Sequence, residues 1–204
     1  MSRLLVLGTH NRKKGRELVD LLSPHGFQLT TLADYPDAIE VVEDGETFAA
    51  NAALKATQQA RHLGQWVLGE DSGLCVDALD GRPGVYSARY AGDGAADDDN
   101  NRRLLQDLAE TPQERRAAHY VCHVTLSDPA GEVRLDAEAH CRGRIRFEPA
   151  GQAGFGYDPL FEIIEYRRTF GELGDAVKSV LSHRSRALRQ FVPQLLRLAA
   201  ESTW

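Results

Sequence analysis

Two short polar stretches of the sequence carry residue types that suit phosphate and divalent-metal binding. One stretch contains two adjacent carboxylates, Glu70 and Asp71, directly after the apolar residues 66–68. The other follows the apolar residues 4–7 and contains Thr9, His10, Asn11, Arg12, Lys13 and Lys14. Backbone N–H groups at the start of a helix bind phosphate, and carboxylate oxygens are the ligands that Mg²⁺ prefers. Together the two stretches indicate a metal-assisted phosphate site.

A second acidic segment, residues 43–46, precedes an expected helix that contains Lys55. Thr47 could cap this helix, which would give the polar residues a structural role alone. Glu43 could instead reach the same metal as Asp71. Lys55 could equally face solvent, as most helical lysines do. The local sequence leaves both readings open for Glu43 and Lys55.

A glycine-rich segment, residues 151–159, suits the binding of a flat ring and contains Phe155, Gly156, Tyr157 and Asp158. A heterocycle could stack on one of the two aromatic rings while Asp158 or backbone groups contact its edge. The alternative is a turn whose aromatic side chains fill the core.

Lys178, His183 and Arg184 lie just before or at the start of the last expected helix, with Ser182 as its N-cap. Cations in a first turn oppose the helix dipole, a cost more readily tolerated where the charges bind a base carbonyl or a phosphate.

Two further clusters have better structural explanations than metal binding. The acidic residues 97–99 lack the ligand spacing of a calcium loop and are typical of a helix N-terminus. His119 and His140 should face each other across a hairpin, while alternation sends Cys122 and His123 to opposite faces, so the group matches no zinc pattern. Cys75 is expected to be a small core residue.

The apolar patterns predict an α/β protein with a mixed sheet and helices around it. Pro193 should kink the last helix or mark a boundary. That helix should place Leu188, Phe191, Val192, Leu195 and Leu196 on one face. The expected strands are 3–8, 27–32, 66–70 and 74–78, with a hairpin formed by 119–126 and 133–145; the expected helices are 12–22, 47–63, 98–109 and 183–200.

Composition restricts the classes of protein that fit. A chain of 204 residues with 42% apolar residues can form one compact domain or two lobes. The net charge of −6 argues against a general nucleic-acid binder. Three cysteines without paired spacing favour a reducing compartment, and no apolar run is long enough for a membrane span. These features predict a cytoplasmic protein that does not bind membranes.

Six motifs in order resemble the inosine triphosphate pyrophosphatase (Ham1-like) family. The resemblance extends from about Leu4 to the last helix, which is essentially the whole chain. Several ordered motifs are far more specific than any one alone. The motifs are Thr9-x-Asn11-x-x-Lys14, Thr47-Phe48-x-x-Asn51-Ala52-x-x-Lys55-Ala56, Asp71-Ser72-Gly73-Leu74, residues 83–90, Phe155-Gly156-Tyr157-Asp158-Pro159 and Ser182-His183-Arg184.

The resemblance implies one two-lobed domain spanning residues 1–204, an elongated mixed sheet with flanking helices around a central substrate cleft, and a homodimer. It implies Mg²⁺-dependent hydrolysis of ITP, dITP and XTP to the monophosphate and pyrophosphate, which keeps deaminated purines out of DNA and RNA. Asp71 and Lys55 would be catalytic, and Glu43, Asp71 and Glu70 would bind metal. The substrate would be held by Thr9, His10, Asn11, Arg12, Lys13, Lys14, Ser72, Phe155, Gly156, Tyr157, Asp158, Lys178, His183 and Arg184.

The sequence departs from the family pattern at three positions. His10 stands where glycine is common, Glu70 where aspartate is common, and Ala50 where glutamate is common. Three other functions remain to be weighed: a nucleotide sensor that does not need the carboxylates, an RNA-binding protein, and a pyrophosphatase for modified pyrimidine nucleotides.

Overall fold

The structure is a computed structural model that describes residues 3–201 and 204. The chain forms two compact units. Unit 1 contains the residues up to Asp71, Cys122–Ala139 and the residues from Arg184 onward, and unit 2 contains Ser72–Val121 and His140–His183. Each unit is therefore assembled from separate stretches of the sequence.

The strands form one mixed sheet, which confirms the α/β class with flanking helices. In the described chain the order of its seven strands is β2-β1-β3-β4-β5-β6-β7. β1 pairs in parallel with β2 and β3, whereas β6 pairs antiparallel with β5 and β7. The strands are β1 (Leu4–Leu7), β2 (Gln28–Thr31), β3 (Val67–Val76), β4 (Ala117–Ser127), β5 (Val133–Ile145), β6 (Phe161–Ile163) and β7 (Arg168–Thr169).

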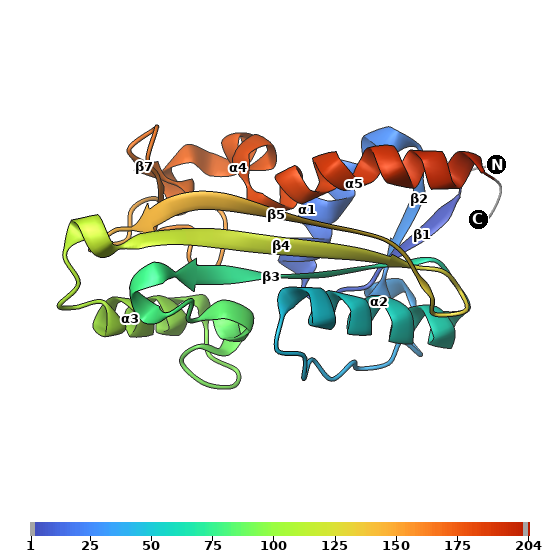
Figure 1. Cartoon of the computed structure of the whole chain (residues 1–204), viewed down its shortest axis with the longest axis horizontal. Helices are drawn as coiled ribbons and strands as arrows, with labels where there is room; N and C mark the ends of the chain where they lie inside the picture. Colours follow the sequence, from blue (N-terminus) through green and yellow to red (C-terminus); the bar gives the residue numbers. More distant parts are fainter. Residues whose placement is uncertain (1–2, 202–203) are drawn as a thin grey trace. The chain divides into compact units, whose positions relative to one another are not determined.

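Helices cover both faces of the strands in unit 1 (Figure 1). Successive strand residues point to opposite faces, so Leu5 and Leu7 pack on α1 (Arg12–Leu22) and α5 (His183–Ala200). Val6 and Val67 pack instead beside Ala60 of α2 (Phe48–Leu63). Unit 1 thus contains the start of α1, the N-terminal half of α2 and the first half of β3, up to Asp71.

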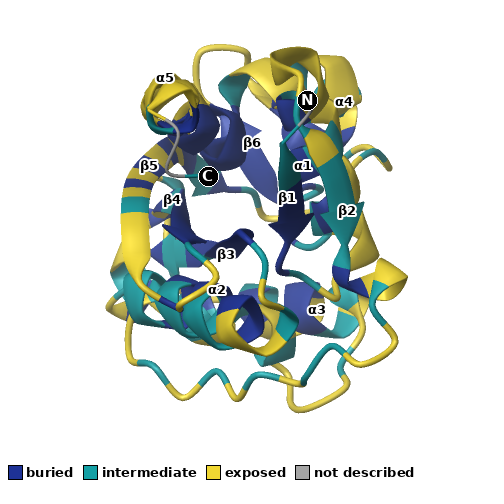
Figure 2. Ribbon diagram, turned by 90° about the vertical axis from the view of Figure 1, so that its right-hand side faces the viewer, coloured by how far each residue is buried: buried dark blue, intermediate teal, exposed yellow. Residues whose placement is uncertain are grey.

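Unit 2 has its own apolar core, to which α3 (Asp97–Asp107) contributes Leu104 and α4 (Phe170–Leu181) contributes Phe170. The strands supply most of the remaining core side chains, and these are buried, as Figure 2 shows for β6. No helix in the described residues has the length and apolar composition that a membrane crossing requires.

Most of the expected elements are present, with four differences. The strands expected at 66–70 and 74–78 are one continuous strand, β3. α4 and the short strands β6 and β7 were not expected. α5 continues through Pro193, so this proline marks no boundary. Leu196 is exposed, although Leu188, Phe191, Val192 and Leu195 are buried as expected.

Gly69 allows β3 to pass very close to α2. A Cβ atom at this position would lie 2.2 Å from the carbonyl oxygen of Ala52 in α2. Only glycine therefore permits this close approach of strand and helix.

Candidate functional site

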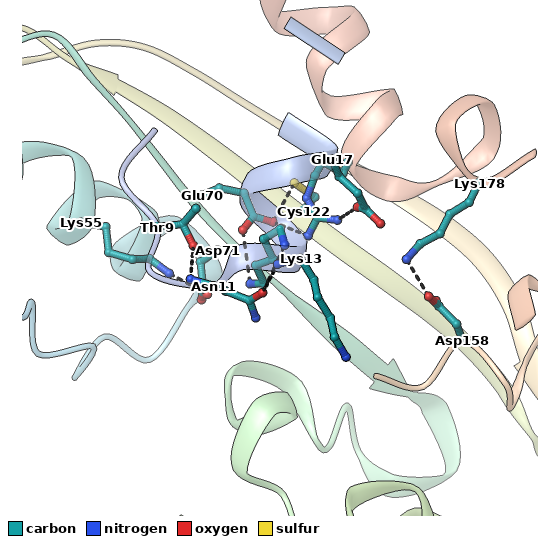
Figure 3. A network of polar contacts seen from close by, with 12 residues as sticks. Thr9, Asn11, Lys13, Glu17, Lys55, Glu70, Asp71, Cys122, Asp158 and Lys178 are labelled. Atoms are coloured by element: carbon teal, nitrogen blue, oxygen red, sulfur yellow. Dashed lines mark hydrogen bonds and ion pairs between the residues drawn. The ribbon is translucent and has the colours of Figure 1, made fainter. Parts of the chain in front are cut away.

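Lys55 joins two carboxylates that are far apart in the sequence. Its Nζ lies 2.8 Å from Glu43 Oε2. It also lies 3.0 Å from Asp71 Oδ1 (Figure 3). Burial raises the pKa of Asp71, although Lys55 and Lys14 oppose this. Burial alone would lower the pKa of Lys55, but the neighbouring carboxylates raise it. The structure thus brings together Glu43, Lys55 and Asp71 in unit 1.

Asn51 adds a second link in the same place. Its Nδ2 lies 3.4 Å from Asp71 Oδ2, and its Oδ1 accepts a 2.8 Å hydrogen bond from the backbone of Gly45. The side chain is 1% exposed, so both contacts are shielded from water. No role was expected for Asn51, although it lies four residues before Lys55 and therefore on the same helix face.

Glu70 lies among cations on the other face of β3, because consecutive strand residues alternate. Its two carboxylate oxygens lie 3.2 Å from Lys14 Nζ and 2.9 Å from an Arg184 guanidinium nitrogen. Arg184 also pairs with Glu17, and these carboxylates raise its pKa although burial alone would lower it. The structure therefore pairs Glu70 with Lys14 and Arg184, whereas Glu43 and Asp71 pair with Lys55. Glu70 and Lys14 are still near enough to affect the pKa of Asp71.

The basic loop between β1 and α1 is held by local hydrogen bonds. Thr9 Oγ1 accepts from the Asn11 backbone at 3.2 Å. Asn11 Oδ1 accepts from the backbone of Lys13 and Lys14 at 3.0 and 3.1 Å, which makes Asn11 the N-cap of α1. The cap uses two of the N–H groups expected to bind phosphate. The side chains of His10, Arg12 and Lys13 are exposed at this loop.

The Glu43–Asp71 pair fits a hard divalent cation such as Mg²⁺. Two carboxylates from separate elements converge on one positively charged nitrogen. Among the described residues, no three His, Cys, Asp or Glu side chains form a metal-ligand group. Mg²⁺ typically takes one or two carboxylates and completes its shell with waters and substrate phosphates, so a two-carboxylate site matches it.

A second polar group lies in unit 2, where Lys178 and Asp158 form a buried ion pair of 2.6 Å. Lys178 Nζ also lies 4.1 Å from the centre of the Phe155 ring. Asp158 accepts from the Phe155 backbone at 2.8 Å and from the Tyr120 hydroxyl at 3.4 Å. Four residues of unit 2 thus form one connected group.

Gly156 is held from α3. Asp97 Oδ2 accepts from its backbone N–H at 3.0 Å, and Asn101 Nδ2 donates to its carbonyl at 2.9 Å. Its φ of 62° favours glycine. Tyr157 is buried in the core, with its hydroxyl donating to the Ser87 carbonyl, whereas Phe155 is half-buried. Of the two aromatic residues, Phe155 is therefore the better candidate for stacking on a ligand.

His183 packs against an aromatic stack. The rings of His183 and Tyr120 are 4.6 Å apart and nearly parallel, and Tyr120 also packs against Phe161 at 4.6 Å. His183 belongs to unit 2, whereas Arg184 belongs to unit 1. Ser182 has extended backbone angles directly before α5, as a cap position requires. Ser72 lies on β3 immediately after Asp71, at the start of unit 2.

Other expectations concern residues outside these groups. The rings of His119 and His140 stack 5.2 Å apart, as the hairpin predicted. Cys122 packs in the core beside Glu70, while His123 pairs with Glu138. In α3, Asp99 Oδ2 accepts from the Ala96 backbone, which confirms a capping role in the acidic run. The expectation that Cys75 is a core residue was wrong, because this residue is only half-buried.

The sequence signals for Asp97, Asn101 and Tyr120 were weak. Asp97 belonged to a run explained by helix capping, and Tyr120 and Asn101 belonged to no motif. Their contacts with Gly156, Asp158 and His183 depend on tertiary structure that local spacing does not reveal.

Known proteins with this sequence pattern and fold are numerous. A profile of the Ham1 family matches residues 5–194. A dITP/XTP pyrophosphatase of Rhodopirellula baltica is 60% identical over 199 residues, covering 98% of this chain and 96% of the relative. A HAM1 protein from Coxiella burnetii has a TM-score of 0.87 and 33% identity, covering 96% of this chain and 99% of its own.

A structure of a nucleoside-triphosphatase / dITP/XTP pyrophosphatase from Mycobacterium abscessus has a TM-score of 0.76 and 40% identity, covering 94% of this chain and 99% of its own. Sequence and fold similarity thus extend over nearly the same residues, and they include every motif from the basic loop to Ser182-His183-Arg184. The chain belongs to the Ham1 family.

Proposed function

We propose that the protein is a Mg²⁺-dependent pyrophosphatase that hydrolyses ITP, dITP and XTP to the monophosphate and pyrophosphate. The convergence of Glu43, Lys55 and Asp71 carries this proposal, because it offers carboxylate oxygens and a cation at one place. The names and high identity of the relatives support the substrate class. In the cell, this activity would keep deaminated purines out of DNA and RNA.

The residues of unit 1 would bind the triphosphate and prepare the attacking water. Lys13 and Arg12 at the start of α1 supply positive charge to phosphate oxygens, with His10 and Thr9 in the same loop. Ser72, which follows Asp71 and is the first residue of unit 2, would also contact phosphate. Asp71 accepts a proton from water, which then attacks the α-phosphorus while the bond to the β-phosphate oxygen breaks. Lys55 stabilises the ionised form of Asp71 before this transfer and that of Glu43 throughout.

Glu43 and Asp71 would hold the metal. Bound there, Mg²⁺ would neutralise phosphate charge and lower the pKa of a coordinated water. Glu70 is a candidate further ligand, although it forms ion pairs with two cations. Lys14 and Arg184, which Glu70 pairs with, would contact the substrate from the same unit.

The residues of unit 2 would recognise the base. Phe155 offers a ring face for stacking, and Lys178 and His183 offer donors for the 6-oxo group that hypoxanthine and xanthine carry and adenine lacks. Asp158, Gly156 and Tyr157 hold these groups in place. An unsatisfied buried polar group costs about 1–3 kcal/mol, so one mismatch gives roughly ten- to hundredfold discrimination.

The family resemblance also supports a homodimer. Composition and net charge support a cytoplasmic protein that binds neither membranes nor nucleic acid. Analytical ultracentrifugation of the purified protein tests the dimer. A monomer at micromolar concentration would contradict it.

The decisive experiment is a turnover assay with and without Mg²⁺ on ITP, dITP, XTP, GTP and ATP, with pyrophosphate and orthophosphate measured separately. We expect Mg²⁺-dependent release of pyrophosphate from ITP, dITP and XTP, with ATP and GTP nearly inert. Orthophosphate from all substrates would indicate a general phosphohydrolase. Binding without turnover would indicate a nucleotide sensor.

A further inference from the structure

The segment of residues 37–45, which carries Glu43, has no regular secondary structure and runs beside α2 (Figure 1). Within the described chain, no backbone–backbone hydrogen bond holds residues 39–45. An irregular segment without such bonds would ordinarily be free to sample several conformations. Some other set of contacts must therefore fix the position of Glu43.

Side chains of α2 supply these contacts at four places. His62 Nε2 lies 2.6 Å from the carbonyl oxygen of Asp37. Gln59 Nε2 donates to the carbonyl of Ile39 at 2.5 Å. Towards the other end of the segment, Lys55 pairs with Glu43 and Asn51 accepts from the Gly45 backbone.

The four helix residues lie on one stripe of α2. Asn51, Lys55, Gln59 and His62 are spaced by four, four and three residues, which keeps them on one helix face. Their partners run in the opposite order along the segment, from residue 45 to residue 37. Successive turns of α2 thus contact successive parts of the segment, which runs antiparallel to the helix.

We propose that Gln59, together with Asn51 and His62, is a positioning residue that keeps the 37–45 segment in register, so that Glu43 faces Lys55 and Asp71. This proposal rests on the metal-binding role of Glu43 in the proposed function. Gln59 is 1% exposed, and its side chain bonds the carbonyl of Ile39. Gln59 therefore acts on Glu43 through the segment and does not touch the substrate.

Gly45 supports the same arrangement from the opposite side. A Cβ atom on Gly45 would lie 2.6 Å from Asn51 Oδ1 and 2.8 Å from the Ala50 Cβ. The segment therefore approaches α2 too closely for any other residue at this position, and Gly45→Ala should displace it.

The test compares Gln59→Leu with Gln58→Leu. Gln58 is the adjacent residue, and its side chain has no hydrogen bond in the described part of the chain. Mn²⁺, which prefers the same oxygen ligands as Mg²⁺, is the probe, and its dissociation constant is measured by electron paramagnetic resonance without nucleotide. Hydrogen–deuterium exchange of residues 38–45 is measured on the same samples.

We expect Gln59→Leu to speed exchange in the segment and to weaken Mn²⁺ binding about fivefold, the factor for loss of one buried hydrogen bond. Gln58→Leu should change neither quantity. Gly45→Ala should act like Gln59→Leu. In a Glu43→Gln background, Gln59→Leu should have no further effect on Mn²⁺ binding, because its influence acts through Glu43.

Three results would overturn the proposal: unchanged exchange, faster exchange with unchanged Mn²⁺ affinity, or an equal loss in the Glu43→Gln background. Absence of Mn²⁺ binding by the unsubstituted protein would overturn it together with the metal role of Glu43. Failure of the proposed substrate class is separate, since it would leave Mn²⁺ binding intact while ITP, dITP and XTP were not hydrolysed.

Discussion

The polar side chains of the two units are held in different ways. In unit 1, the charge cluster of Lys14, Glu43, Lys55, Glu70, Asp71 and Arg184 consists of cations paired with carboxylates. In unit 2, the ring cluster of Tyr120, Phe155, Asp158, Lys178 and His183 is fixed by stacked rings, a backbone donor and one buried ion pair.

This difference indicates that the charge cluster and the ring cluster have different roles. Ion pairs in the charge cluster can be exchanged for pairs with phosphate or metal, so its arrangement can change when a ligand binds. The ring cluster is fixed by contacts that the protein makes with itself, so it is preorganised. Substitutions in the charge cluster should therefore reduce the rate, whereas those in the ring cluster should reduce stability and base selectivity.

Asp71→Asn should have the largest effect of any single substitution. We expect kcat on ITP to fall by about 10³-fold, because the carboxylate that accepts the proton is lost. Steady-state kinetics measure this, and nucleotide binding should persist. Asp44→Asn, the same change at an exposed carboxylate, should keep full activity. Full turnover by Asp71→Asn would contradict the prediction that substitutions in the charge cluster reduce the rate.

Lys178→Met should mainly destabilise the protein. It leaves the carboxylate of Asp158, which is 1% exposed, without its cation, and breaking a buried pair costs about 3–5 kcal/mol. Urea denaturation measures this loss. Lys13→Met, at an exposed lysine, should change the unfolding free energy by less than about 0.5 kcal/mol. Equal effects of the two variants would contradict the idea of a preorganised ring cluster.

Asp97→Ala should lower base selectivity with little change in kcat. It removes the acceptor for the Gly156 backbone N–H, which lets the loop around Phe155 shift. We expect the ratio of kcat/KM for ITP to that for ATP to fall about fivefold, as for one hydrogen bond. Asp98→Ala, at the exposed neighbour, is the control. A lower kcat with an unchanged ratio would place Asp97 with the rate-determining residues instead.

Tyr120→Phe should have the smallest effect. It keeps the stacking on His183 and removes a hydroxyl whose contact with Asp158 is long, at 3.4 Å. We expect a loss of less than about 1 kcal/mol in unfolding free energy. Tyr120→Leu, which also removes the stack, should cost more and should reduce selectivity for ITP. If the two variants behave alike, stacking contributes nothing to the ring cluster.

Much of the fold follows from apolar periodicity in the sequence. α1 and α2 could be predicted because capping residues precede regular apolar patterns, and Asn11 and Thr47 do cap them. α4 could not, because Gly174 inside it has a φ of 77° and interrupts the helical pattern. β3 appeared as two strands because its polar residues, which belong to the candidate site, interrupt its apolar pattern.

The candidate site was predictable as a set of motifs, but its pairings were not. Nothing in the sequence shows that Lys55 reaches both Glu43 and Asp71. Strand alternation could have shown that Glu70 and Asp71 point to opposite faces. The contacts of Asn51, Gln59 and Tyr120 depend on how separate elements pack, which one sequence does not specify.

The chain crosses between the units at Asp71–Ser72, Val121–Cys122, Ala139–His140 and His183–Arg184. Neither unit therefore corresponds to one continuous gene segment. Exchanging one whole unit by recombination would need crossovers at all four points, whereas a unit made of one consecutive stretch needs at most two. The two units are therefore inherited together, and a change confined to one of them is reached most directly by point substitution.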